Sequence, residues 1–140
     1  MECVIHWTPS AGMVMVAETG SGHLLTMDGA PEGGGRNLGP RPMETMLAGA
    51  GGCTAYDVVL ILQRGRHKVS GCKVSIKAQR AETDPKVFTA LHMHYQVTGQ
   101  ALPEASVARA VALSHEKYCS ATAMLGRTAD ITQSLEVLEG

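Results

Sequence analysis

A long apolar segment between Pro42 and Arg66 constrains the fold more than any other feature of the sequence. Its interior carries one charged residue, Asp57, and is otherwise rich in Met, Leu, Ile, Val and Ala. Pro42 suits a first helical position, Glu44 suits the positive end of a helix, and Arg64 suits the negative end. The sequence therefore predicts a helix over residues 42–66, about 36 Å long, that is buried on nearly all sides.

Such a helix is larger than a small chain comfortably encloses. The protein has 140 residues, of which 44% are hydrophobic and 18% are charged, and this composition suits one globular domain over residues 1–140. We therefore expect a second subunit to cover part of the helix.

The segments on either side of the helix indicate an α+β fold. "CVIHW", "MVMVAET" and "HLLTMDG" are short, apolar and separated by turn residues, which predicts strands. After the helix, "CKVSIKAQ" and "LHMHYQV" alternate apolar and polar residues, as strands with one buried and one solvated face do. "PEASVARAVALSHEKY" and "SATAMLG" then predict two helices, and "DITQSLEV" predicts a last strand.

The segment 30–41, "APEGGGRNLGPR", precedes the long helix and is rich in glycine and proline. A glycine-rich loop ahead of a helix is one way to bind phosphate. This loop lacks the Gly-Lys-Ser/Thr ending of a P-loop, so we favour a flexible connection.

Charge and composition argue against several classes of partner. The formal net charge is -1 and the basic residues are scattered, so we expect neither nucleic-acid binding nor a basic membrane face. No basic start with a following apolar run opens the chain, and we expect no stretch of about 18 residues that spans a membrane. A cytoplasmic protein without a bound cofactor is the expectation.

Three glycines weaken the long helix just before a cysteine. Gly49, Gly51 and Gly52 together cost about 2 to 3 kcal/mol relative to alanine, which suggests that another helix or a ligand approaches closely beside Cys53. Two interpretations stay open at this point. Cys53 is either a small buried apolar residue at a helix crossing or a reactive thiol.

A second cysteine, Cys119, favours thiol chemistry. It lies at the start of "SATAMLG", where unpaired backbone N–H groups of a helix favour a thiolate. In such a pair, Cys53 attacks the O–O bond of a peroxide and becomes a sulfenic acid. Cys119 then condenses with it to a disulfide, which an external dithiol reduces.

Other candidate residues have plainer interpretations. His92 and His94 share a strand face, but no third ligand stands at a useful spacing, so we expect a solvated face and no metal site. His115 stands one helical turn before Cys119 and either polarises that thiol or lies on the surface. Cys3 and Cys72 are interpreted as core residues.

The segments "RPMETMLAGAGGCTAYDVVLIL" and "SHEKYCSATAML" resemble the two signature segments of the OsmC/Ohr family of thiol-dependent peroxidases, and especially its YhfA-like branch. The resemblance implies that Pro42 opens the central helix, that Cys53 is peroxidatic and that Cys119 is resolving. It also implies an intertwined homodimer, with antiparallel sheets wrapped around long central helices and active sites at the subunit interface. The implied substrates are organic hydroperoxides, and the implied reductant is a dithiol such as a lipoylated protein.

The sequence departs from the family pattern at two positions. The family's helix-start glutamate is replaced by Met43, with Glu44 one residue later as its candidate substitute. The family also places an arginine in its N-terminal strands, whereas Arg36 and Arg41 are the first arginines here. We therefore take Glu44, Arg36 and Arg41 as candidate catalytic residues.

Asp57 follows Cys53 by one helical turn on the same face. An unpaired carboxylate there raises the pKa of the thiol, so a cation is needed nearby. Both a catalytic role and a structural one, as a buried carboxylate hydrogen-bonded across the dimer, stay open for Asp57.

Apolar residues near the glycines suggest a substrate pocket, formed by Met43, Met46, Leu47 and Met124. The competing hypothesis is a non-catalytic binding module. In that case this pocket holds an apolar small molecule, and Cys53 is inert or merely reacts with electrophiles.

Overall fold

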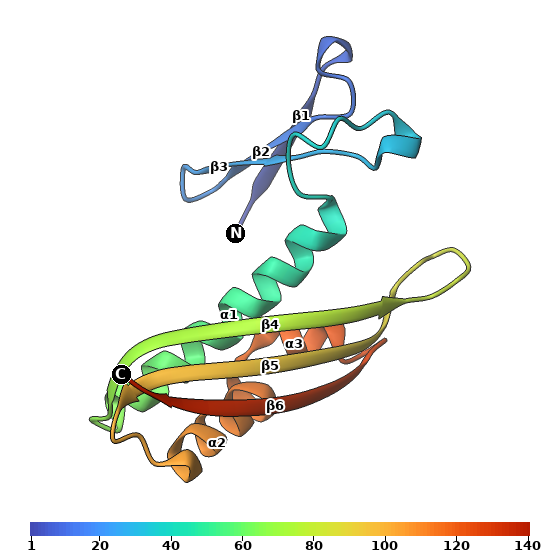
Figure 1. The fold of residues 1–140 in the computed structure, drawn as a ribbon. Coiled ribbons are helices and arrows are strands. Elements are labelled where there is room, and N and C mark those ends of the chain that lie inside the picture. Colours follow the sequence, from blue (N-terminus) through green and yellow to red (C-terminus); the bar gives the residue numbers. More distant parts are fainter. The chain divides into compact units, whose positions relative to one another are not determined.

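The computed structural model describes residues 1–140 as a mixture of helices and two separate three-stranded sheets (Figure 1). The chain divides into two compact units, Met1–Ala48 and Gly49–Gly140. The predicted α+β class is confirmed, and each unit contains one of the sheets.

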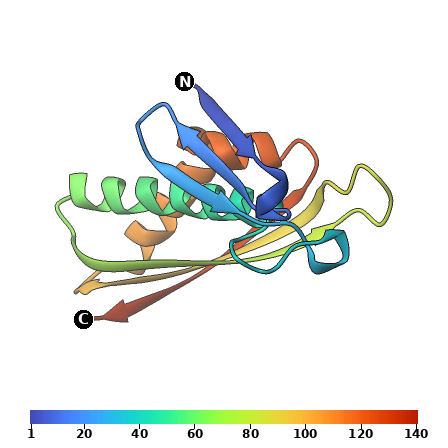
Figure 2. The ribbon, with the colours of Figure 1, turned by 90° about the horizontal axis from the view of Figure 1, so that it is seen from above.

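The sheet of the first unit is an antiparallel meander in the order β1-β2-β3. Its strands are β1 (Cys3–Trp7), β2 (Met15–Thr19) and β3 (Leu24–Met27), drawn in blue in Figure 2. All three predicted strands are present. Short 3₁₀ turns lie at Pro9–Ala11 and Pro31–Gly33.

The glycine-rich segment after β3 is held together by the buried carboxylate of Asp28. This carboxylate accepts hydrogen bonds from the backbone N–H groups of Gly29 at 2.7 Å, Arg36 at 2.9 Å and Leu38 at 3.1 Å. The bonds from Leu38 and Arg36 lower the pKa of Asp28 the most, because they favour its charged form. The segment that we expected to be a flexible connection is therefore organised around one acid.

Helix α1 (Pro42–Arg64) has 23 residues and ends two residues before the predicted end. Arg66 adopts a left-handed φ of 62° and its N–H bonds to Gln63, while the N–H of His67 bonds to Leu62. This pattern of bonds is a Schellman motif, which satisfies the last carbonyls of the helix.

Burial along α1 differs from the prediction. Its buried residues are spaced four apart and form a single stripe, consisting of Ala50, Thr54, Val58 and Leu62. Met46 and Tyr56 are 51% and 68% exposed, so one chain does not bury the helix on nearly all sides. Contrary to our expectation, α1 contains an apolar stretch of 18 residues, with a mean hydropathy of 1.5, which by length and composition alone is enough to cross a membrane, as is also true of some core helices of soluble proteins.

The sheet of the second unit has the order β4-β5-β6 and is mixed. Strands β4 (Lys68–Arg80) and β5 (Phe88–Gln100) are antiparallel, whereas β6 (Asp130–Glu139) runs parallel to β5. The expectation of purely antiparallel sheets is therefore wrong here. A parallel pair needs a long crossover, which helices supply in this unit.

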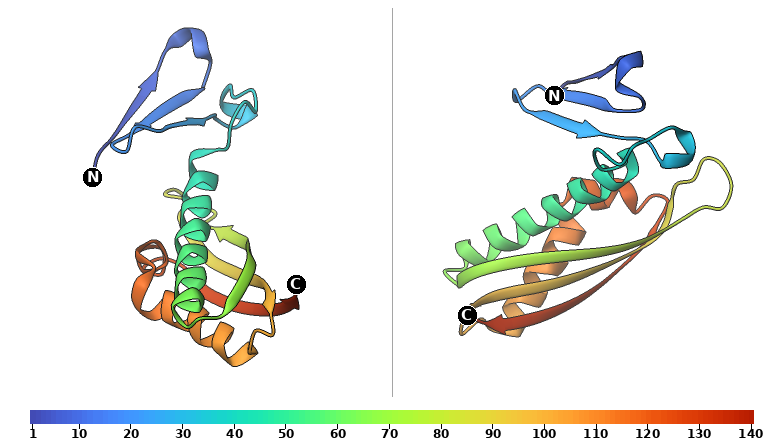
Figure 3. Two further views of the ribbon diagram at one scale, coloured as in Figure 1. Left: turned by 90° about the vertical axis from the view of Figure 1, so that its left-hand side faces the viewer. Right: turned by 45° about the horizontal axis from the view of Figure 1, so that its top comes forward.

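The crossover consists of α2 (Glu104–Leu113), a π-helical turn (Ser114–Tyr118) and α3 (Ser120–Leu125). The single helix predicted for residues 103–118 thus changes to π geometry in its last turn. Figures 2 and 3 show these helices and the second-unit part of α1 on the same side of the β4-β5-β6 sheet.

The core of the second unit lies between this sheet and the helices. Strand β5 is central in the sheet, and its alternate residues Leu91, Met93, Tyr95 and Val97 are buried, as the period-two pattern predicts. Residues of α1 and α2 are buried as well, namely Val58, Leu62, Val107, Ala110 and Val111.

Replacing Asp28 with Asn should lower the urea midpoint of the folded protein at pH 7, measured by circular dichroism. The amide offers one acceptor oxygen and points N–H donors toward backbone N–H groups. The lowered pKa means that Asp28 stabilises the folded state fully above the ordinary carboxyl pKa of about 3.9. This stabilisation is lost as the pH falls through the pKa that Asp28 has in the folded state. The difference between wild type and Asp28→Asn should therefore shrink below about pH 4.

The matched control is Glu32→Gln, which removes an exposed carboxylate from the same segment. It should leave the midpoint unchanged. Equal midpoints for wild type and Asp28→Asn at pH 7 would contradict the organising role of Asp28.

Candidate functional site

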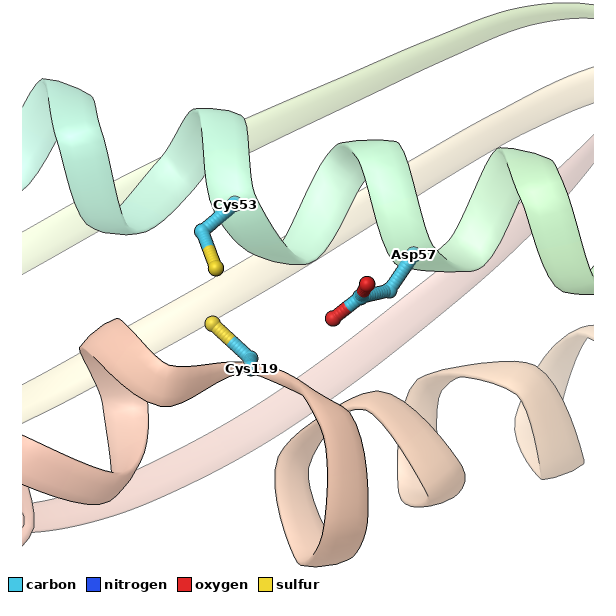
Figure 4. Close-up of side chains that lie close together, drawn as sticks. All are labelled: Cys53, Asp57 and Cys119. Atoms are coloured by element: carbon cyan, nitrogen blue, oxygen red, sulfur yellow. The ribbon is translucent and has the colours of Figure 1, made fainter. Parts of the chain in front are cut away.

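Three reactive side chains converge in the second unit. The sulfurs of Cys53 and Cys119 and a carboxylate oxygen of Asp57 all lie within 4.8 Å of one another. Figure 4 shows Cys53 and Asp57 projecting from successive turns of α1 toward Cys119, which lies on the opposite segment. Both thiols are free, so the structure shows the reduced form of the pair.

Local backbone structure fixes the position of Cys119. Its N–H closes the π-helical turn by donating to the carbonyl of Ser114 at 2.8 Å. Cys119 is also the N-cap of α3, where its sulfur accepts a bond from the N–H of Thr122 at 3.5 Å. The predicted location of Cys119 at a helix start is confirmed. Cys119 is 2% exposed, so a substrate cannot reach the thiol pair from the side of Cys119.

Cys53 is only partly buried and offers that access. Burial raises the pKa of the Cys53 thiol, and the nearby Cys119 and Asp57 raise it further, whereas the N–H of Ala121 acts in the opposite direction. The ordinary pKa of a cysteine is about 8.5, so these neighbours keep Cys53 mainly as a thiol at neutral pH.

Asp57 ends a chain of buried hydroxyl groups. Ser114 donates to its carboxylate at 3.0 Å, Thr54 lies 2.9 Å from Ser114, and Tyr95 lies 2.8 Å from Thr54. Each hydroxyl has one proton, and an ionised carboxylate only accepts. Once Ser114 donates to Asp57, Thr54 must donate to Ser114, and Tyr95 has the proton that is left for Thr54, with Met93 Sδ at 3.6 Å as a second acceptor. The hydrogen bonds from Thr54 through Ser114 to Asp57 therefore run in one direction, and they orient Asp57 within the cluster.

Sequence reasoning did not identify Thr54, Ser114 and Tyr95 as parts of the site. All three are 0% exposed and lie on stripes that are otherwise apolar. A hydroxyl at a position that periodicity assigns to the core must find a buried partner. A hydroxyl residue within an otherwise apolar stripe is therefore the sequence feature that would have indicated these three residues.

Asp57 also lacks a cationic partner in the structure. The ion pairs are His6 with Glu18, Arg41 with Glu44, and His94 with Glu136. Asp57 is only partly buried, and its carboxylate accepts a hydrogen bond from Ser114 of the same chain, whereas the structural interpretation placed that bond across a dimer.

The glycines before Cys53 have different surroundings. A Cβ on Gly51 would meet the side chain of Ile76 at 3.2 Å, so the predicted close approach exists there, against strand β4. A Cβ on Gly49 or Gly52 would meet nothing within 4 Å in this chain. Close approach of strand β4 therefore explains Gly51. Gly49 and Gly52 are not in close contact with any other part of this chain.

The candidate catalytic residues of the first unit, Glu44, Arg41 and Arg36, form hydrogen bonds or ion pairs with one another or with the nearby backbone. Glu44 accepts from the N–H of Arg41 at 2.9 Å and forms an ion pair with its guanidinium at 3.9 Å, which caps the start of α1. The guanidinium of Arg36 donates to the carbonyl of Ala11 at 2.9 Å. Both contacts are structural roles that the sequence did not reveal.

The predicted pocket residues Met43, Met46 and Leu47 belong to the start of α1 in the first unit, and Met124 on α3 is 69% exposed. The ring of His92 bonds to Thr132 and Ser134 on β6, and the ring of His94 also bonds to Ser134. These histidines are thus part of a polar sheet face, as expected.

Residues 33–134 match the family model described as OsmC-like protein. Protein YhfA of Escherichia coli K12 is 44% identical over 138 residues, which cover 99% of this chain and 98% of YhfA.

Solved structures agree with this match. A hypothetical protein from Aquifex aeolicus VF5 has a TM-score of 0.84 at 29% identity, covering 99% of this chain and 96% of its own. An organic hydroperoxide resistance protein OsmC from Legionella pneumophila shares the fold, with a TM-score of 0.72 at 19% identity and 98% of each chain covered. The family match includes α1, the crossover helices and both cysteines of the cluster, and the protein therefore belongs to the OsmC-like family.

Proposed function

We propose that this protein is a thiol-dependent peroxidase that reduces organic hydroperoxides. The observation that carries the proposal is the pair of free thiols, Cys53 and Cys119, whose sulfurs lie within 4.8 Å of each other. Membership of the OsmC-like family supports it, since a member of the same fold is described as an organic hydroperoxide resistance protein.

In the first step, the thiolate of Cys53 attacks one oxygen of the hydroperoxide. A sulfur–oxygen bond forms, the O–O bond breaks, and the leaving alkoxide takes up a proton to become an alcohol. Cys53 is thereby oxidised to a sulfenic acid. Cys53 is the attacking thiol because it is the more exposed of the two.

In the second step, the thiolate of Cys119 attacks the sulfur of Cys53. The disulfide forms, and the hydroxide that leaves is protonated to water. The sulfurs must approach to about 2.05 Å, which is a short movement from a separation of at most 4.8 Å. An external dithiol, such as a lipoylated protein, then reduces the disulfide and is itself oxidised.

Serine variants separate the roles of the two cysteines. Cys53→Ser should abolish consumption of cumene hydroperoxide, because an alcohol does not replace a thiolate at neutral pH. Cys119→Ser should consume one equivalent and leave Cys53 as a sulfenic acid that dimedone traps, with steady turnover lost. Mass spectrometry of the modified peptides measures both outcomes.

Cys72→Ser is the matched control, because Cys72 is a partly buried cysteine outside the cluster. It should retain full turnover. A wild-type protein that forms no Cys53–Cys119 disulfide with hydroperoxide would rule out the proposed cycle.

Asp57→Asn should make Cys53 more reactive. The negative charge of Asp57 raises the pKa of Cys53, so its removal lowers that pKa and increases the thiolate fraction at pH 7. Alkylation of Cys53 by iodoacetamide should become a few-fold faster, with its pH profile displaced to lower pH. The amide oxygen can still accept the bond from Ser114.

Glu116→Gln removes an exposed carboxylate from the π-helical turn and is the charge-matched control. Its alkylation profile should match that of wild type. A profile that moves to higher pH in Asp57→Asn would show that Asp57 promotes the thiolate instead.

We also propose that the protein is a cytoplasmic homodimer in which a second copy covers the exposed face of α1. The support is the apolar character of α1 and the exposure of Tyr56, at 68%. Light scattering should give about twice the chain mass of 14.7 kDa. Tyr56→Glu should shift the protein toward monomer, whereas Leu138→Glu, at a position 37% exposed on β6, should not. A wild-type monomer would contradict the proposal.

A second candidate function is a non-catalytic module that binds apolar molecules. It is favoured by a groove of about 320 Å³ along α1 and β4, lined by Ala55, Tyr56, Val59, Leu60, Gln63 and Cys72. Binding of an apolar ligand that persists in Cys53→Ser, together with no hydroperoxide consumption by wild type, would favour this module over the peroxidase.

A further inference from the structure

The cluster of Cys53, Asp57 and Cys119 also has the composition of a metal site. Two thiolate sulfurs and a carboxylate oxygen are ligands that Zn²⁺ accepts, and soft sulfur ligands select Zn²⁺ over Mg²⁺ or Ca²⁺. The sequence spacing gave no sign of such a site, because the ligands come from α1 and from the segment before α3.

The distances suit a tetrahedral ion. Zinc–sulfur bonds of about 2.3 Å at a tetrahedral angle place two sulfurs about 3.8 Å apart. The ligand atoms of the cluster are separated by at most 4.8 Å, so side-chain movements of about 1 Å or less bring them to bonding positions.

The surroundings hold the ligands in place. Asp57 is oriented by Ser114, and such second-shell hydrogen bonds orient metal ligands in known sites. Cys119 is fixed between the π-helical turn and α3, and Cys53 provides the partly exposed side of the cluster. None of the ion pairs of the structure involves Asp57, so the cluster has carboxylate charge without a paired cation.

We propose that the reduced protein binds one Zn²⁺ per chain through Cys53, Cys119 and Asp57, with the fourth position left to water. Binding displaces the two thiol protons to solvent and forms two zinc–sulfur bonds and one zinc–oxygen bond. This site goes beyond the proposed peroxidase, because it requires no oxidant. Zinc and hydroperoxide then compete for the same sulfurs, so the metal protects the pair from oxidation.

Metal titration of the reduced, tag-free protein tests the site directly. Zn²⁺ is titrated against a chromophoric chelator, and Co²⁺ is used as a spectroscopic probe. Wild type should bind one equivalent of Zn²⁺, and Co²⁺ should give a sulfur-to-metal charge-transfer band. Loss of a second-shell partner costs about 10- to 100-fold in metal affinity, so Ser114→Ala should fall in that range and Cys53→Ser should lose at least about 100-fold.

Cys72→Ser is again the matched control and should bind zinc as wild type does. Asp57→Asn should weaken zinc binding while it displaces the pH profile of Cys53 alkylation to lower pH. Circular dichroism of each variant establishes that it is folded. Zinc should also slow alkylation of Cys53 and Cys119 but leave the exposed Cys3 unaffected.

Unchanged zinc affinity in Cys53→Ser, or no binding by wild type, would overturn the metal site. These measurements use no hydroperoxide. A failure of the metal site therefore leaves the disulfide test intact, and a failure of the peroxidase leaves the zinc titration intact.

Discussion

The buried hydroxyl chain from Tyr95 through Thr54 and Ser114 to Asp57 is the interaction on which the site depends. It joins the central strand β5, helix α1 and the π-helical turn, which are distant in sequence. Each of its hydroxyl groups is withdrawn from water, and an unsatisfied group there costs about 1 to 3 kcal/mol. The same bonds that satisfy these groups thus fix the register between the two segments that contribute thiols.

This anchoring gives the site an unusual electrostatic character. A peroxidatic thiol needs positive charge nearby, yet the neighbours of Cys53 in the second unit are another thiol and a carboxylate. Within one chain, Arg36 and Arg41 have their own partners in the first unit. The proposed peroxidase therefore requires positive charge from outside the cluster of Cys53, Asp57 and Cys119.

Much of the fold was predictable, because it depends on local patterns. The alternation in residues 91–97 identified the buried face of β5, and the apolar run after Pro42 identified α1. The parallel pairing of β6 was missed because a strand's own pattern does not specify its neighbour. The two cysteines were identified from their helix positions and a family resemblance. The hydroxyl chain was missed because its members are distant in sequence, and the roles of Arg41 and Glu44 depended on cap geometry.

The π-helical turn at Ser114–Tyr118 accommodates one residue more than an α-helical turn does. In a regular helix an extra residue rotates everything after it by about 100°. Here the wider turn takes up that residue, so Cys119 keeps its place as the N-cap of α3 and faces Cys53. If one residue were removed from this turn, regular α-helix would take its place and the direction of Cys119 would be kept. The crossover is therefore free to vary by one residue at this turn without loss of the thiol pair.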